Sequence, residues 1–137
     1  MANIHELTLG DVARENARRF RKRTAFIGED GRQVTYEELD VRVTKAANSL
    51  RAAGLGPGSR ILWLGVNSSD IFELLLASSK IGACLCVGNW RNAVDELTYV
   101  LDDFSPSLVV WQDADIGEKV AKARAATSSE PVWVRHD

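Results

Sequence analysis

The chain has 137 residues, of which 45% are hydrophobic and 26% are charged, a composition typical of one soluble globular domain. Seventeen Lys and Arg residues nearly balance nineteen Asp and Glu residues. We therefore expect no nucleic-acid partner, because phosphate binding requires a concentrated positive field. No apolar run approaches the ~18 residues of a membrane span, and the N-terminus lacks the basic-then-apolar layout of a secretory signal. The sequence predicts a cytoplasmic protein.

One basic segment departs from this balance, with five cations among residues 18–23 (Arg-Arg-Phe-Arg-Lys-Arg). We interpret it as the solvated end of a helix, where cations also suit the negative pole of the helix dipole. Contact with a membrane surface or a polyanion is the alternative.

Cys84 and Cys86 are two residues apart in an apolar run. On a strand they would share a face about 7 Å apart, too far to form a disulfide. The only histidines, His5 and His136, lie near the chain ends, so we expect no metal site. We interpret both cysteines as small buried hydrophobes in a reducing compartment.

The first fifty residues predict two helices separated by a hairpin. Thr8, followed three residues later by a carboxylate, indicates one helix start, and Thr35 with Glu38 forms the capping-box pattern of the next. Between them, residues 24–27 and 32–35 flank a glycine-containing turn, as in a β-hairpin.

After Gly54, which is well placed to end the second helix, short apolar runs alternate with helical patterns. Strands are predicted at residues 61–64, 83–87, 108–111 and 131–134, and helices at 70–81, 94–104 (capped by Asn92) and 116–126. This alternation predicts right-handed βαβ crossovers. The expected fold class is α/β, with a mainly parallel sheet preceded by an N-terminal helix and a β-hairpin.

In an open parallel sheet, ligands bind at the carboxyl ends of the strands. These ends are residues 65–67, 88–91 and 112–113. The second is the richest, because Gly88 permits close backbone approach, Trp90 can stack and Arg91 can bind phosphate or carboxylate. A plain strand-to-helix loop is an equally weighted alternative.

Three other polar or glycine-rich segments lack the pattern of a catalytic site. Residues 54–58 lack the Lys-Ser/Thr of a phosphate loop and precede a strand, so we interpret them as a helix stop and tight turn. Asp102 and Asp103 are splayed by about 100° on a helix and are interpreted as solvated surface. Residues 127–129 are interpreted as a loop. Because histidines are so few, no Ser/His/Asp or Cys/His constellation can be assembled, and we expect no catalytic residue.

Several motifs nevertheless occur in an informative order: residues 34–39 (Val-Thr-Tyr-Glu-Glu-Leu), 54–61, 67–70, 80–83 (Lys-Ile-Gly-Ala) and 95–103. Their order and spacing resemble the opening of the adenylate-forming, or AMP-binding, superfamily. This superfamily includes acyl- and aryl-CoA synthetases, nonribosomal peptide adenylation domains and luciferases. The resemblance extends from about Leu7 to Val134, and it is greatest to the acyl-CoA synthetase (fatty-acid-CoA ligase) family.

The resemblance implies that residues 1–137 are a truncated N-terminal subdomain of the large AMP-binding domain, with no complete second domain. The parent enzyme would join a carboxylic (fatty) acid to ATP, releasing pyrophosphate, and CoA would then displace AMP to form a thioester. It would use ATP, Mg²⁺ and CoA. In the family, the phosphate-binding loop and the catalytic lysine lie beyond the matched region, so the chain itself is expected to be an inactive scaffold that binds none of these cofactors tightly.

The loop at residues 88–91 departs from the family's usual Leu-Asn-Pro-Arg, since only Asn89 and Arg91 match. In some CoA-forming members, the matching loop bears glycine and an aromatic residue and faces the CoA nucleotide. The resemblance therefore implies a CoA-facing role for Gly88, Asn89, Trp90 and Arg91.

Two alternatives remain open: a freestanding α/β ligand-binding or interaction module, and part of an adenylation domain that loads a carrier protein. We also expect the chain to leave apolar sheet surface exposed and therefore to self-associate.

Overall fold

A computed structural model describes residues 8–137, so His5 and the start of the resemblance at Leu7 lie outside the described residues. The chain divides into two compact units. The first contains residues 8–57 and Ser68–Ala83, and the second contains Gly58–Asn67 and Cys84–Asp137.

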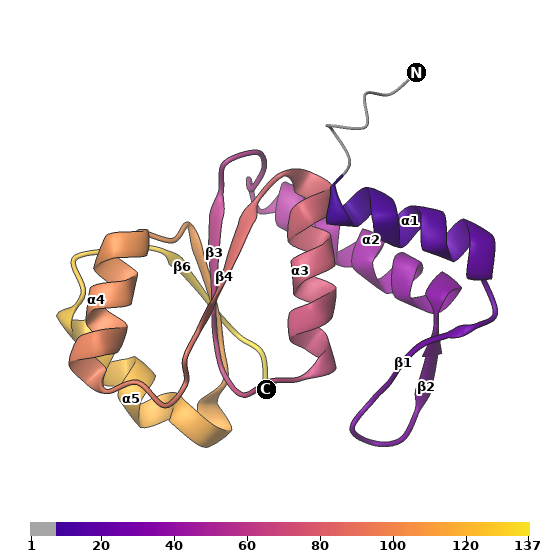
Figure 1. The fold of residues 1–137 in the computed structure, drawn as a ribbon. Helices are drawn as coiled ribbons and strands as arrows, with labels where there is room; N and C mark the ends of the chain where they lie inside the picture. Colours follow the sequence, from indigo (N-terminus) through magenta and orange to yellow (C-terminus); the bar gives the residue numbers. More distant parts are fainter. Residues whose placement is uncertain (1–7) are drawn as a thin grey trace. The chain divides into compact units, whose positions relative to one another are not determined.

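The first unit consists of three packed helices and a hairpin (Figure 1). The helices are α1 (Leu9–Phe20), α2 (Tyr36–Ala52) and α3 (Ser69–Ile81), and antiparallel strands β1 (Thr24–Ile27) and β2 (Gln33–Thr35) form the hairpin. Both predicted helix starts are confirmed, because the Thr8 and Thr35 hydroxyls each accept a backbone N–H three residues later. The carboxylates of Asp11 and Glu38 complete the two capping boxes.

Lys80 joins α3 to α2 within this unit. Its Nζ lies 2.6 Å from an Asp40 carboxylate oxygen and 2.8 Å from the Thr44 hydroxyl. The side chain of Lys80 is only 16% exposed. This lysine, which is part of the Lys-Ile-Gly-Ala motif, is therefore used for helix packing.

The basic segment at residues 18–23 is exposed, as the sequence predicts. Arg21 and Lys22 both pair with the Glu37 carboxylate, and Arg18 pairs with Glu15. Such pairs between exposed side chains contribute little to stability. The structure supports the interpretation as a solvated helix end.

The second unit is a four-stranded parallel sheet with the strand order β4-β3-β5-β6. Its strands are β3 (Arg60–Leu64), β4 (Cys84–Gly88), β5 (Leu108–Trp111) and β6 (Val132–Arg135), with helices α4 (Val94–Phe104) and α5 (Asp113–Ala126). The predicted α/β class and parallel sheet are confirmed, and each strand boundary lies within one residue of its expected position.

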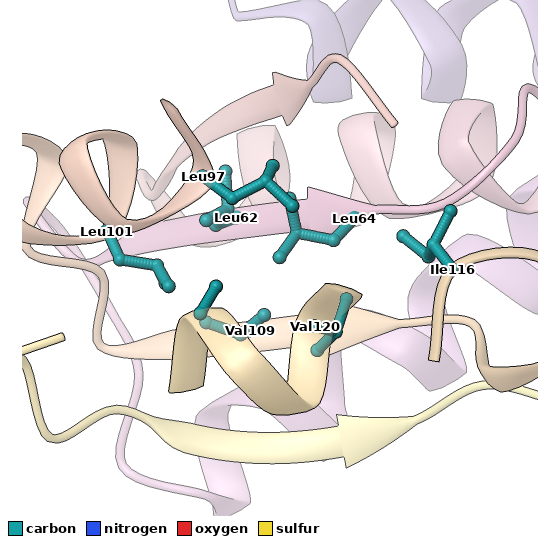
Figure 2. Close-up of a cluster of buried hydrophobic side chains, with 8 residues drawn as sticks. Leu62, Leu64, Leu97, Leu101, Val109, Ile116 and Val120 are labelled. Carbon is teal, nitrogen blue, oxygen red and sulfur yellow. The ribbon is translucent and has the colours of Figure 1, made fainter. Parts of the chain in front are cut away.

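Figure 2 shows the core of this unit, where side chains from α4 and α5 meet the central strands. Leu62, Leu64 and Val109 are fully buried. The side chains that cover them are Leu97 and Leu101 of α4 and Ile116, Val120 and Ala123 of α5. Both helices thus cover the same face of the sheet.

The interpretation of both cysteines as buried residues is wrong for Cys84, which is exposed, while Cys86 is half-buried. The reason is the strand order, because β4 is an edge strand. Both thiols are free, as expected from their spacing. Burial raises the pKa of the Cys86 thiol, with a further contribution from Cys84.

Two helix starts also differ from expectation. Ala93, not Asn92, is the N-cap of α4, and its N–H donates to the Glu96 carboxylate at 2.8 Å. Helix α5 begins at Asp113, three residues before its predicted start. The Asp137 carboxylate accepts the free N–H groups of Asp113 and Ala114, both at 2.8 Å. A partner 23 or 24 residues away leaves no local pattern in the sequence.

The glycine-rich segment at residues 54–58 is a helix stop and turn, as predicted. Gly54 and Gly58 have φ angles of +85° and +81°, values that favour glycine. Among the described residues, no helix combines the length and the apolar character that a membrane span requires.

Candidate functional site

The predicted carboxyl edge exists in the second unit. Leu64 of β3 is in register with Gly88 of β4 and with Trp111 of β5. The segments that leave these three strands, at residues 65–67, 89–91 and 112, therefore begin at the same edge. Asp113, predicted as part of this edge, instead begins α5.

Gln112 ties the exits of β3 and β5 together. Its backbone N–H donates to the Leu64 carbonyl at 3.0 Å, and its side-chain oxygen accepts the Val66 N–H at 2.7 Å. A Cβ at Gly65 would lie 2.5 Å from that side-chain oxygen. Gly65 is therefore required for this close approach.

Gly88 is buried, and its role is internal packing. A Cβ at this position would lie 2.6 Å from the Leu64 side chain and 3.2 Å from the Trp63 carbonyl. The sequence predicts close approach at Gly88, and the approaching atoms belong to β3.

Asn89 organises the loop. Its side-chain oxygen accepts the Arg91 N–H at 3.0 Å, and its carbonyl accepts the Asn92 N–H at 3.0 Å. This pattern is a local turn built by an asparagine side chain. The residue is exposed, but its carboxamide oxygen is engaged within the loop.

The side chain of Lys119, in α5, anchors this loop, and the sequence analysis did not identify this residue. Its ammonium donates to the carbonyls of Trp90 at 2.8 Å and Asn92 at 3.2 Å. The sequence does not indicate that this helical lysine binds the loop, because its two partners are 29 and 27 residues away in the chain.

Trp90 and Arg91 form the part of the loop that can meet a ligand. Trp90 is half-buried and packs against the hydrophobic core, and the Arg91 guanidinium lies 4.2 Å from the centre of its ring. This cation–π contact orients an otherwise mobile side chain. Arg91 is exposed, and it forms no ion pair with a carboxylate of residues 8–137. The arrangement presents an oriented cation that suits a phosphate or carboxylate.

Asp102 is exposed, as the sequence predicts, and its carboxylate also binds the loop that follows α5. Its carboxylate accepts hydrogen bonds from the Thr127 hydroxyl at 2.6 Å and from the Ser128 N–H at 2.8 Å. These bonds lower the pKa of Asp102. The carboxylate therefore fixes the loop after α5. Within residues 8–137, no three metal-ligating side chains cluster.

Comparison with known proteins identifies the family. Residues 13–136 match the family described as AMP-binding enzyme. A fatty acid–[acyl-carrier-protein] ligase from Streptomyces coeruleorubidus is 37% identical over 97 residues, which are 71% of this chain and 18% of that protein. A feruloyl-CoA synthase from an Amycolatopsis species is 41% identical over 80 residues, 58% of this chain and 16% of that protein.

Solved structures agree in fold. A protein described as a long-chain-fatty-acid CoA ligase from Rhodopseudomonas palustris superposes with a TM-score of 0.88 at 34% identity, covering 98% of this chain and 34% of that chain. A fatty acyl CoA synthetase from Mycobacterium tuberculosis has the same fold, with a TM-score of 0.86 at 24% identity over 95% of this chain and 26% of that chain. The present chain thus spans less than a fifth of the two curated relatives and about a third or less of these structures.

The family match covers nearly all of the described residues, and the predicted motifs lie on the expected elements. The chain belongs to the AMP-binding enzyme family.

Proposed function

We propose that this chain is the N-terminal subdomain of the AMP-binding domain of an ATP-dependent acid–thiol ligase, in the cytoplasm. The parent enzyme would convert a carboxylic acid and ATP to acyl-AMP and pyrophosphate, with Mg²⁺, and then transfer the acyl group to CoA. The chain itself would be a scaffold without catalytic activity.

The observation that carries this proposal is the match of residues 13–136 to the family, over a span that is only 16–20% of the length of several ligases. The internal chemistry is consistent with a scaffold. The conspicuous polar groups at the sheet edge, Gln112 and Asn89, are engaged by backbone groups of their own unit.

We further propose that the loop of Gly88, Asn89, Trp90 and Arg91 faces the CoA nucleotide of the parent enzyme. In this proposal, Gly88 and Asn89 set the loop's shape, whereas Arg91 on the Trp90 ring would contact a phosphate. This assignment is supported by the oriented guanidinium, since phosphates favour arginine at such positions.

The test compares the purified 137-residue chain with the product of the complete reading frame. We expect ATP–pyrophosphate exchange, driven by a panel of carboxylic acids, from the longer product only. Exchange by the 137-residue chain would overturn the scaffold role. A stop codon directly after codon 137 would overturn the proposal of a longer parent enzyme and would favour a freestanding module.

The acceptor is tested separately, because one relative is named as a ligase of an acyl carrier protein. The longer product is supplied with free CoA or with a carrier protein, and thioester formation is measured by mass spectrometry. Formation of a thioester with CoA supports the proposal. Exclusive loading of the carrier protein would show that the carrier protein, and not CoA, is the acceptor.

A further inference from the structure

Lys119 binds the loop that follows β4 at two points. Its ammonium donates to the Trp90 carbonyl at 2.8 Å and to the Asn92 carbonyl at 3.2 Å. Both acceptors lie on the connection from β4 to α4, which passes beside α5 (Figure 1). Lys119 is half-buried, and it pairs with no carboxylate of residues 8–137. Within these residues, its ammonium is thus engaged by the loop alone.

The peptide group between Trp90 and Arg91 is held from both sides. In a trans peptide, the carbonyl of one residue and the N–H of the next point in opposite directions, and no described peptide bond is cis. The carbonyl of this group binds Lys119, and its N–H donates to the Asn89 side-chain oxygen at 3.0 Å. Its plane therefore cannot rotate without the loss of at least one hydrogen bond.

The peptide group between Asn92 and Ala93 is held in the same way. Its carbonyl binds Lys119, and its N–H donates to the Glu96 carboxylate at 2.8 Å. The group between these two is fixed as well, because the Asn92 N–H donates to the Asn89 carbonyl at 3.0 Å. Three successive peptide groups are thus fixed, and Lys119 is the side chain that joins the first to the third.

Arg91 lies between the first two of these peptide groups, so their planes set its backbone angles φ and ψ. These angles determine where the Cα–Cβ bond points and which rotamers are open to the side chain. The Arg91 guanidinium then lies over the Trp90 ring, 4.2 Å from its centre, and Trp90 packs against the core. The loop therefore presents the guanidinium in one orientation before any ligand binds.

We propose that Lys119 is a positioning residue for Arg91. It holds the backbone in the conformation that orients the guanidinium, so that the binding of a phosphate does not have to order the loop. This inference rests on the proposed function for its ligand, the CoA nucleotide. The arrangement of the backbone is independent of that assignment.

An ammonium on a long side chain suits this task. It carries three N–H donors and can therefore bind two carbonyls at once, and hydrogen bonds from a charged donor are stronger than neutral ones. Methionine keeps a side chain of similar length without donors. Glutamine keeps a donor on a side chain that is too short to reach both carbonyls. These two residues are the substitutions that test the role of Lys119.

The first test follows amide hydrogen exchange by NMR in the 137-residue chain. In Lys119→Met, exchange at the amides of Arg91 and Ala93 should become about tenfold faster, because opening the loop breaks fewer hydrogen bonds. Lys119→Gln is the second variant and should have the same effect. The amides of Leu62 and Val109 in the core are the internal reference, and their exchange should be unchanged.

Lys122→Met is the matched control. Lys122 lies about one turn further along α5, its side chain is 61% exposed, and it pairs with Glu118. Its replacement should therefore leave the exchange of the loop amides unchanged. Unchanged exchange at Arg91 and Ala93 in both Lys119 variants, or equal acceleration by Lys122→Met, would overturn the positioning role.

The second test is a double-mutant cycle in the parent enzyme, with the KM for CoA as the measured quantity. Lys119→Met should raise this KM by about tenfold, as expected for Arg91→Ala, and should leave kcat and the KM for ATP unchanged. Because Lys119 acts through Arg91, the double variant should have the same KM as Arg91→Ala alone. Effects that multiply in the double variant would show that the two residues act independently and would overturn the proposal.

The two tests separate this inference from the proposed function. If Arg91→Ala leaves the KM for CoA unchanged, the CoA assignment fails, and the exchange measurements still decide whether Lys119 holds the loop. If Arg91→Ala raises that KM and Lys119→Met does not, the CoA assignment stands and the positioning role is overturned.

Discussion

The side-chain oxygen of Gln112 accepts the backbone N–H of Val66 at 2.7 Å, and this bond joins the exits of two neighbouring parallel strands. It exists only because residue 65 is glycine, since a Cβ there would lie 2.5 Å from the same oxygen. The carboxyl edge of the sheet is therefore fixed by a glycine and an amide that are 47 residues apart in the chain.

Gly65→Ala should reduce the free energy of unfolding by about 1–3 kcal/mol, because the methyl group displaces Gln112 in a packed environment. Chemical denaturation provides the measurement. Gly56→Ala is the matched control, because a Cβ at Gly56 meets no atom within 4 Å. Equal effects of the two substitutions would contradict the role assigned to Gly65.

Lys80→Met should destabilise the chain by about 1–2 kcal/mol, because it removes hydrogen bonds to Asp40 and Thr44 from a mostly buried position. Lys45→Met makes the same change at an exposed position of α2 and should have little effect. Thermal unfolding of both variants checks this prediction. A Lys80→Met chain as stable as wild type would show that methionine packing compensates for the lost bonds.

Asp102→Asn should lower stability at neutral pH and weaken its dependence on pH in the acid range. Hydrogen bonds from Thr127 and Ser128 lower the pKa of Asp102 below its ordinary value of 3.8 in the folded chain. The stabilisation is therefore complete above pH 3.8 and is lost as the pH falls through the lower folded value.

The measurement is the difference in unfolding free energy between wild type and Asp102→Asn, followed from neutral to acid pH. This difference should shrink as the pH drops. Asp103→Asn, at the exposed neighbouring position on α4, serves as the control and should give a smaller difference at neutral pH. A difference that grows toward acid pH would contradict the assigned direction of the pKa shift.

Arg91→Ala in the parent enzyme should raise the KM for CoA by about tenfold, the loss expected for one charge-assisted hydrogen bond, with little change in the KM for ATP. Arg124→Ala removes a comparable cation–π pair, in which the guanidinium lies 5.0 Å from the Trp133 ring centre, and should leave both values unchanged. Steady-state kinetics with each substrate varied separately make the comparison. An unchanged KM for CoA would show that Arg91 does not contact the CoA nucleotide.

The sequence by itself determined the local features of this protein. Thr8 and Thr35 cap helices through bonds to residues three positions away, and apolar periodicity locates the strands to within a residue. Such interactions are short in sequence, so the pattern records them.

Only the tertiary structure decided which features meet across the chain. The strand order made β4 an edge and left Cys84 exposed. Lys119 and Asp137 found backbone partners more than twenty residues away. No periodicity encodes these contacts, because they depend on which strands become neighbours and on how far each helix extends.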